Sequence, residues 1–228
     1  MTPSKPVPRQ AVLIVNAHSR RGRMLFRQAV EKLREAGIEL IAAHAIRKPD
    51  LLIPTMKEAV RSGAPMVIVG GGDGSLSCTV DEVVDRDCVF ALLPLGTANS
   101  FARTLGVPLD LDGAIETIRT GRRRRIDLGM IDHDYFANCA AMGLSPMIGE
   151  GVPHKLKRWL GRFGYLIWAI YCLARFRAFR LTVDDGKESR TLWVTEVRIA
   201  NGSFHGGVEL VEQADVASGQ IVVQAVTG

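Results

Sequence analysis

The sequence contains few cysteines, and they are widely spaced. The four stand at Cys78, Cys88, Cys139 and Cys172 of 228 residues. No Cys-x-x-Cys pair occurs, which excludes the common structural zinc motifs, and the chain lacks the dense cysteines of a disulfide scaffold. Reduced thiols are typical of a cytosolic protein, so we expect a cytoplasmic location.

Long apolar runs are also missing. No stretch reaches the roughly 18 apolar residues that a membrane-spanning helix needs. The run Ala11–Val15 is too short for the core of a secretion signal. We therefore expect no transmembrane segment. The chain is nevertheless 47% hydrophobic, which is enough to bury a substantial core.

Aromatic residues make up only 6% of the chain, while the formal net charge is +5. A positive charge suits phosphates, anionic membrane surfaces or nucleic acid. Proteins that bind single-stranded nucleic acid stack bases on aromatic side chains, and this sequence shows no such pattern. We therefore expect no nucleic-acid partner.

The most informative stretch that is present is rich in glycine. Met66–Val69 has the composition of a short buried strand, and Gly-Gly-Gly-Asp-Gly-Ser follows at 70–75. Glycines allow a sharp turn and a close approach of a ligand, and successive N–H groups in such a turn bind anions. A helix that begins beyond the turn adds the positive end of its dipole. The pattern predicts a phosphate-binding loop; a tight turn without a ligand is the alternative.

Apolar runs alternate with helical patterns through the first half of the chain. The expected strands are 11–16, 38–46, 64–69 and 88–93, and the expected helices are 23–36, 50–62, 75–85 and one from about 101. This alternation predicts a parallel sheet with helices on both faces. Ligands of such sheets lie beyond the carboxyl ends of the strands, so the loops after Val15, Val69 and Leu93 should meet at one edge.

The pattern changes after about residue 121. Turn signals at 132–134 and 185–187 separate alternating segments, which indicates hairpins, and 220–226 has the pattern of a last strand. One helix-like segment, at about 155–178, interrupts these strands. We predict an α/β domain at residues 1–124 and an antiparallel domain at residues 125–228.

Three stretches in the first half resemble the motifs of a known family. They are 15–22, the glycine segment 71–75, and 94–103 with the sequence Pro-Leu-Gly-Thr-Ala-Asn-Ser-Phe-Ala-Arg. Together they are similar to the N-terminal motifs of the diacylglycerol kinase catalytic-domain family, which includes bacterial lipid kinases and the sphingosine and ceramide kinases. The likeness continues through 126–129, 138–143 and 201–218. The glycine motif is shared more distantly with NAD kinases and phosphofructokinases.

The resemblance implies a fold, an activity and a set of residues. The fold is an α/β domain of the NAD kinase and phosphofructokinase kind followed by an antiparallel β-sandwich, with ATP in the cleft between them. The activity is that of an ATP-dependent lipid kinase, which transfers the γ-phosphoryl group to a lipid hydroxyl with Mg²⁺. The implied nucleotide-binding residues are Asn16, Gly71, Gly72, Asp73, Gly74, Ser75, Gly96, Thr97 and Asn99. Asp73 is also the implied catalytic residue, since it helps to organise the phosphates and the metal.

Several positions depart from the family's pattern. The glycine loop usually continues with threonine, any residue, asparagine and glutamate; here Ser75 keeps a hydroxyl and Cys78 replaces the carboxylate. The aspartate after the asparagine of the next motif is Ser100. The late Asp-Gly motif, which in some bacterial relatives helps to hold Mg²⁺, reads Ser218-Gly219, and we expect Asp215 and Ser218 as the metal ligands.

A carboxylate general base in this family lies well beyond the Asp-Gly motif, so we expect the second domain to be incomplete at Gly228. A general base contributes about 10²–10⁴ in rate. Two alternatives therefore stay open beside the lipid kinase. One is a nucleotide-binding module without turnover, and the other is a kinase of a soluble acceptor.

Two basic features bear on the partner. Arg122–Arg125 suits nucleotide phosphates or anionic lipid heads. The segment 154–177 has basic ends around an apolar middle, as in a helix that lies at a membrane surface. The alternative for the arginine run is a solvated helix end and strand start. The alternative for segment 154–177 is a helix packed on the second domain with its basic ends in water. We expect a lipid substrate at a membrane surface and peripheral membrane association; the acceptor lipid and the oligomeric state stay open.

Overall fold

The computed structural model describes residues 5–151 and 154–227, and for 149–151, 154–163 and 165 it describes the backbone alone. The chain divides into two compact units. Unit 1 contains Met1–Asn138 and Asn201–Gln220, and unit 2 contains Cys139–Ala200 and Ile221–Gly228. The expected division at residues 124 and 125 marks a change in sequence pattern and stays a prediction.

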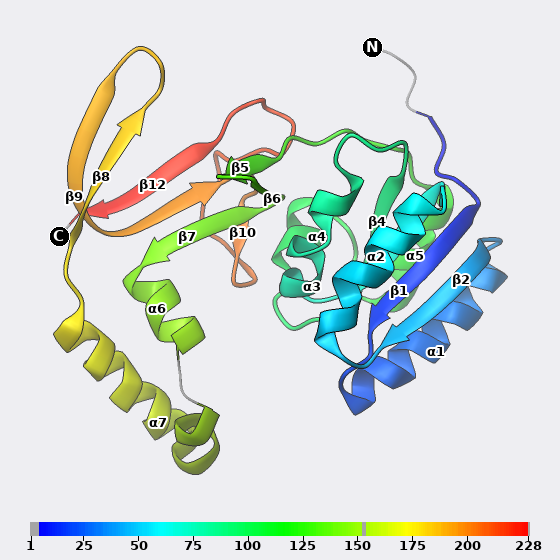
Figure 1. The fold of residues 1–228 in the computed structure, drawn as a ribbon, viewed down its shortest axis with the longest axis horizontal. Coiled ribbons are helices and arrows are strands. Elements are labelled where there is room, and N and C mark those ends of the chain that lie inside the picture. The colour runs from blue at the N-terminus through cyan, green and yellow to red at the C-terminus, as the bar shows by residue number, and fades with distance from the viewer. Residues whose placement is uncertain (1–4, 152–153, 228) are drawn as a thin grey trace. The chain divides into compact units, whose positions relative to one another are not determined.

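Unit 1 is built on a parallel sheet (Figure 1). Its strands are β1 (Gln10–Asn16), β2 (Glu39–Ile46), β3 (Met66–Gly71) and β4 (Val89–Pro94), in the order β2-β1-β3-β4. Every neighbouring pair is parallel. The carboxyl ends of β1, β3 and β4 therefore meet at one edge, as the sequence predicts.

Helices cover both faces of this sheet because its strand residues alternate between two apolar cores. One core joins Leu13, Val15, Met66 and Ile68 to helices α1 (Arg20–Glu35) and α5 (Leu111–Thr120). The other joins Val12, Ile14, Val67 and Val69 to α2 (Leu52–Arg61) and α4 (Ser100–Thr104). The central strands are buried on both sides, which explains their continuous apolar runs. The predicted α/β architecture is confirmed.

The helices differ in detail from the expected ranges. Helix α1 begins three residues early, because the Ser19 hydroxyl accepts a hydrogen bond from Gly22 N at 3.0 Å and caps the helix. The expected helix 50–62 is a short 3-10 helix, η1 (Pro49–Leu51), followed by α2. Helix α5 lies outside the expected elements, and Asp110 caps it by accepting from Gly113 N at 2.8 Å.

The expected helix 75–85 is wrong in both start and length. The helix α3 (Asp73–Ser77) begins inside the glycine segment, and a 3-10 helix, η2 (Val80–Val83), follows it. Thr79 between them is fully buried, and its hydroxyl donates to Leu76 O at 3.1 Å. A threonine that bonds the backbone in this way competes with helical continuation.

The rest of unit 1 consists of short antiparallel pairs. The predicted hairpin at 132–134 is confirmed as β5 (Gly129–Ile131) and β6 (Asp134–Phe136), with Asp132 in the left-handed region at φ 54°. The strands β10 (Phe204–His205) and β11 (Val208–Glu209) form the second pair. Segment 201–220 thus returns to unit 1 after the chain has passed through unit 2.

Unit 2 contains an antiparallel sheet. Its strands are β7 (Cys139–Gly143), β8 (Phe179–Asp184), β9 (Ser189–Ala200) and β12 (Val222–Thr227), with β9 between β12 and β7 and also paired with β8. All these pairs are antiparallel, as expected for the second half. Buried Glu196 of β9 accepts hydrogen bonds from Ser145 and Arg198.

Two helices accompany this sheet, α6 (Leu144–Gly151) and α7 (His154–Arg175). Helix α7 coincides with the expected helix-like segment, although the side chains of its basic start at 154–159 lie outside the described residues. Among the helices of the described chain, none has the length and apolarity to cross a bilayer.

The core of unit 1 makes a direct stability prediction. Ile68 on β3 is fully buried, whereas Ile41 on the edge strand β2 is 55% exposed. Replacing Ile68 by alanine should lower the free energy of unfolding by about 2–5 kcal/mol, since it leaves a cavity. Ile41→Ala, the matched control, should change it by less than about 1 kcal/mol. Urea denaturation followed by circular dichroism measures both, and equal losses would contradict the assigned core.

Candidate functional site

The glycine segment and the loop after β4 touch through their backbones. Leu95 N donates to Gly71 O at 2.9 Å. A Cβ atom added at Gly96 would overlap Cα of Gly72, and one added at Gly72 would lie 3.3 Å from Cα of Gly96. The two loops therefore form one continuous backbone surface at the carboxyl edge of the sheet. We call this pair of loops, residues 70–75 and 94–100, the double loop.

The glycines of the double loop have different roles. A Cβ atom at Gly71 would lie 2.6 Å from the Cβ of Ser75, so packing requires glycine there. A Cβ atom at Gly74, by contrast, would meet nothing within 4 Å. Gly74 is exposed and faces open space. Because α3 begins at Asp73, the helix itself offers no acceptor to the N–H groups of Asp73 and Gly74.

Asn16 connects the end of β1 to the double loop. Its side-chain amide donates to Ser75 Oγ at 3.0 Å, and its carbonyl oxygen accepts from His18 N at 3.3 Å. The predicted residues of the first and second motifs are therefore in direct contact. Asn16 is half-buried, so its contacts within the protein fix its orientation.

Asn99 shapes the loop after β4 from inside. It adopts a left-handed backbone at φ 49° and is 4% exposed. Its side chain accepts from Gly96 N at 2.9 Å and donates to Gly96 O at 3.1 Å. Both amide atoms therefore bond the loop's own backbone. Thr97, in the same loop, is exposed.

Asp73 joins the two halves of the double loop. Its Oδ1 accepts a hydrogen bond from Phe101 N at 3.0 Å. Phe101 is the second residue of α4, so the carboxylate lies at the positive end of that short helix. This structural contact is one that the sequence did not reveal, because the two residues are 28 positions apart.

Two polar residues that were not expected as site residues extend the double loop. Ser100 Oγ accepts from Gly207 N at 3.0 Å, and Arg103 Nε donates to Ala98 O at 3.0 Å. Thr104 Oγ1 donates to Asn138 at 2.8 Å, and Asn138 in turn donates to Phe204 O at 2.7 Å. The segment 201–210 is thus fastened to α4. Arg103 lies within a recognised motif, which was the available signal, while the Gly207 contact has no local sequence signal.

Cys78 does not replace the charge of the glutamate that the family usually has at this position. Desolvation raises the pKa of the Cys78 thiol above its ordinary value, and Asp81 adds to the shift. The thiol is therefore protonated at neutral pH. The sulfur lies 3.4 Å from Ser75 O, as a neutral donor.

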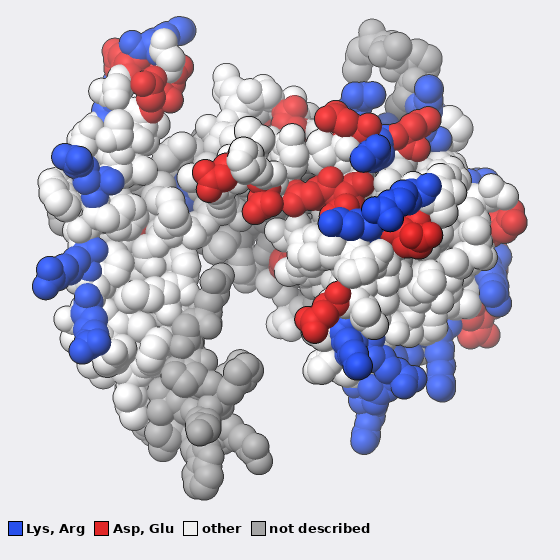
Figure 2. All heavy atoms as spheres, viewed as in Figure 1, with Lys and Arg blue, Asp and Glu red and all other residues white. Residues whose placement is uncertain are grey.

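Basic side chains gather near the start of α1 (Figure 2). Arg20, Arg23 and Arg27 line a groove on one side of this helix. The first turn of α1 contains no acidic residue. Since α1 follows β1 directly, this positive charge lies toward the same edge of the sheet as the double loop.

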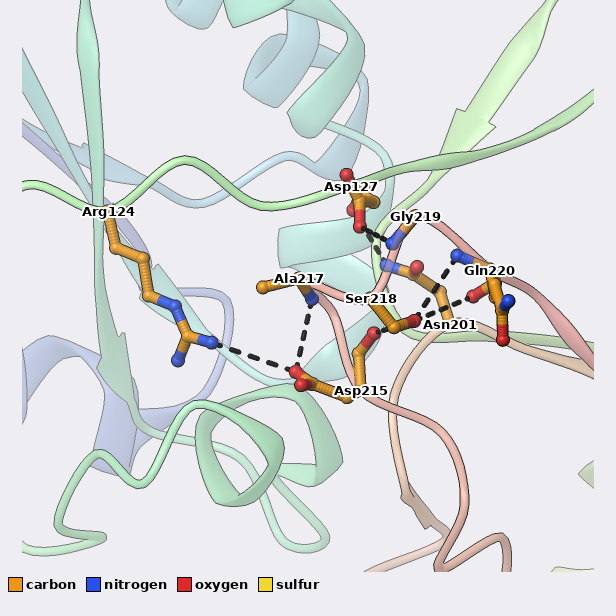
Figure 3. Close-up of polar contacts among 8 residues, drawn as sticks. All are labelled: Arg124, Asp127, Asn201, Asp215, Ala217, Ser218, Gly219 and Gln220. Atoms are coloured by element: carbon orange, nitrogen blue, oxygen red, sulfur yellow. Dashed lines mark hydrogen bonds and ion pairs between the residues drawn. The ribbon is translucent and has the colours of Figure 1, made fainter. Parts of the chain in front are cut away.

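The expected metal ligands Asp215 and Ser218 are close together, but they are engaged with the protein (Figure 3). The Asp215 carboxylate accepts from Ala217 N at 3.1 Å and lies 3.6 Å from Arg124 Nη2. Ser218 Oγ donates to Asp215 O at 2.8 Å and accepts from Gln220 N at 3.2 Å. Within the part of the chain that the structure describes, no three His, Cys, Asp or Glu side chains gather as a metal site.

Comparisons with known proteins agree with these features. The model of the diacylglycerol kinase catalytic domain matches residues 10–131. A protein of Klebsiella pneumoniae (strain 342), named "Probable lipid kinase YegS-like", is 32% identical over 206 residues, which is 89% of this chain and 69% of that protein. A diacylglycerol kinase of Staphylococcus aureus (strain JH9) is 31% identical over 185 residues, which is 78% of this chain and 58% of that protein.

The fold is also found among solved structures. The crystal structure of a diacylglycerol kinase from Bacillus anthracis str. Sterne superposes with a TM-score of 0.74 at 21% identity, over 100% of this chain and 78% of that one. The shared architecture is that of the parallel sheet with its helices, followed by antiparallel sheets.

The double loop leads to a prediction about two of its glycines. Gly96→Ala should lower the free energy of unfolding by about 1–3 kcal/mol, because the new methyl group overlaps the Gly72 backbone. Gly74→Ala is the matched control. Gly74 lies in α3 with open space around it, so alanine should leave stability unchanged or raise it by up to about 1 kcal/mol. Thermal unfolding of the two variants measures the contrast, and similar melting temperatures would contradict the backbone contact.

Proposed function

The chain belongs to the diacylglycerol kinase catalytic-domain family, and on this premise we propose that it transfers the γ-phosphoryl group of ATP to the hydroxyl of a diacylglycerol-like lipid. One observation carries the proposal. Three loops from separate strands meet in unit 1 and leave open space over Gly74, beside backbone N–H groups at the start of a helix. Phosphoryl transfer depends on positioning and charge neutralisation, which such a site supplies.

The nucleotide-binding role rests on the double loop and Asn16. We assign the phosphates to the backbone of Gly71, Gly72, Gly74 and Ser75, with Gly96, Thr97 and Asn99 shaping the adjoining wall. The open space at Gly74 would admit a ligand, and the exposed residue Thr97 would offer a hydroxyl to it. Mg²⁺ that arrives with ATP would neutralise part of the phosphate charge.

Asp73 has a defined role in this proposal. One of its carboxylate oxygens holds Phe101 N, so Asp73 fixes α4 and the loop before it. Asp73 is half-buried at the start of α3, and its carboxylate would orient the cations that accompany the phosphates. Asp73 therefore has two roles in this proposal: it positions α4, and its carboxylate helps to organise the phosphates and their metal ion.

The lipid acceptor calls for a surface that meets a bilayer, and we assign this to α7. Leu166, Ile170 and Leu173 follow one another at helical spacing and are 56%, 59% and 63% exposed. Arg175 ends the helix and lies over the Tyr171 ring. An apolar stripe with a cation at its end suits an interface with anionic lipids.

The kinase proposal is tested with the protein, Mg-ATP and mixed vesicles that contain diacylglycerol. Asp73→Asn keeps an oxygen that accepts from Phe101 N but removes the charge. We expect this variant to unfold like the wild type and to lose at least about tenfold in lipid phosphorylation. Asp73→Ala removes both functions, so it should lose stability as well as activity.

A second variant separates binding from turnover. Gly74→Val places a side chain in the open space, where its Cβ atom meets nothing within 4 Å, so it should fold normally and lose the heat of Mg-ATP binding in calorimetry. Binding by the wild type without lipid phosphorylation would favour a nucleotide-binding module, a function that the neutral Cys78 and Ser100 also suit. Phosphorylation of soluble alcohols, but not of diacylglycerol in vesicles, would contradict the proposed lipid acceptor. No binding by the wild type would reject the whole proposal.

The assignment of α7 leads to a separate prediction. Leu173→Asp should weaken co-sedimentation with phosphatidylglycerol-containing vesicles by about tenfold, since it places a charge in the apolar stripe. Leu51→Asp is the matched control in unit 1, because Leu51 is also exposed, at 51%, and is the N-cap residue of α2, where aspartate is favourable. Equal binding by both variants would show that α7 does not face the bilayer.

A further inference from the structure

The turn at residues 215–220 is closed by its own polar groups. Asp215 O accepts from Ser218 N at 3.1 Å and from Ser218 Oγ at 2.8 Å. Ser218 Oγ in turn accepts from Gln220 N at 3.2 Å. The hydroxyl is therefore used in holding the turn together, and it is a poor ligand for a cation that prefers carboxylates.

The single carboxylate of this turn already has a cation beside it. Asp215 lies 3.6 Å from Arg124 Nη2 and also accepts from Ala217 N. A divalent ion at the same carboxylate would be repelled by the guanidinium and would have to displace it. Mg²⁺ also requires about six oxygen ligands in near-ideal octahedral geometry. One carboxylate and one committed hydroxyl do not meet this requirement.

The stretch that contains Arg124 also contacts the turn through hydrogen bonds of Asp127. Asp127 Oδ2 accepts from Gly219 N at 2.7 Å, and Asp127 N donates to Val216 O at 2.6 Å. Buried Asn201 donates to the backbone oxygen of Asp127 at 2.7 Å and so holds this stretch in place. Figure 3 shows both contacts, that of Arg124 with Asp215 and that of Asp127 with Gly219.

We propose that Arg124 is the built-in cation of the 215–220 turn, and that this turn needs no divalent metal ion. The ion that accompanies ATP is a separate matter, since it arrives with the nucleotide. The inference concerns the anchoring of segment 201–220 to unit 1, and it stands whether or not the chain phosphorylates a lipid.

The test measures thermal unfolding without nucleotide, in EDTA and in 10 mM MgCl₂. If a protein binds the ion and the free ion concentration is about 100 times the dissociation constant, its melting temperature should rise by about 5–10 °C. We expect the melting temperature of the wild type to change by less than about 1 °C. A magnesium-dependent rise of several degrees that Asp215→Asn abolishes would overturn the proposal.

Substitution of the cation provides the positive side of the test. Arg124→Ala should lower the melting temperature by about 1–3 °C, because an exposed ion pair contributes little. Arg125→Ala is the matched control, since Arg125 is an exposed neighbour on the same stretch. Equal effects of the two variants would count against Arg124 as the cation of the turn.

A double variant asks whether removing the guanidinium makes room for a metal ion. Arg124→Ala with Ser218→Asp places a second carboxylate beside Asp215 and removes the competing charge. This variant should become more stable in MgCl₂ than in EDTA, whereas Ser218→Asp alone should not, because Arg124 then pairs with the added carboxylate. A magnesium response of Ser218→Asp alone, as large as that of the double variant, would overturn the role of Arg124.

Discussion

The contact between the backbones of Gly72 and Gly96 is the constraint on which the candidate site depends. Two loops that follow adjacent strands approach until there is no room for a side chain at Gly96. This closeness lets Leu95 N bond Gly71 O and brings the Asp73 carboxylate to the start of α4. A side chain at Gly96 would push the two loops apart, whereas a Cβ atom at Gly72 would lie 3.3 Å from Cα of Gly96 and would need only a small adjustment.

A chain of hydrogen bonds connects this contact to segments that are distant in sequence. Asp73 positions α4, and Ser100 at the start of α4 accepts a hydrogen bond from Gly207. Asp127 then fastens Gly219 to the same unit. Segment 201–220 thus belongs to unit 1 although 62 residues of unit 2, Cys139–Ala200, intervene. A chain that returns to its first unit in this way ties the two units together covalently at several points.

The candidate site has fewer acidic residues than the family's motifs usually contain. A protonated thiol stands at Cys78, and Ser100 uses its hydroxyl as an acceptor for the backbone. Carboxylates remain at Asp73, Asp127 and Asp215, and positive charge lies at arginines of α1 and at Arg124. At the 215–220 turn, the cation beside the Asp215 carboxylate is the guanidinium of Arg124.

The sequence by itself determined the parallel sheet, its two covered faces and the edge where the loops meet. Apolar runs such as Met66–Val69 and the glycines after them encode these features locally. Only the tertiary structure decided what Asp73, Asn99 and Ser218 bond. Their partners at Phe101, Gly96 and Gln220 depend on how loops pack or on how a loop turns back on itself, and no periodicity records such contacts. The early start of α3 and the Arg124–Asp215 pair were decided in the same way, because the residue at which this helix begins and an ion pair across 91 positions are set by chain geometry and not by local propensity.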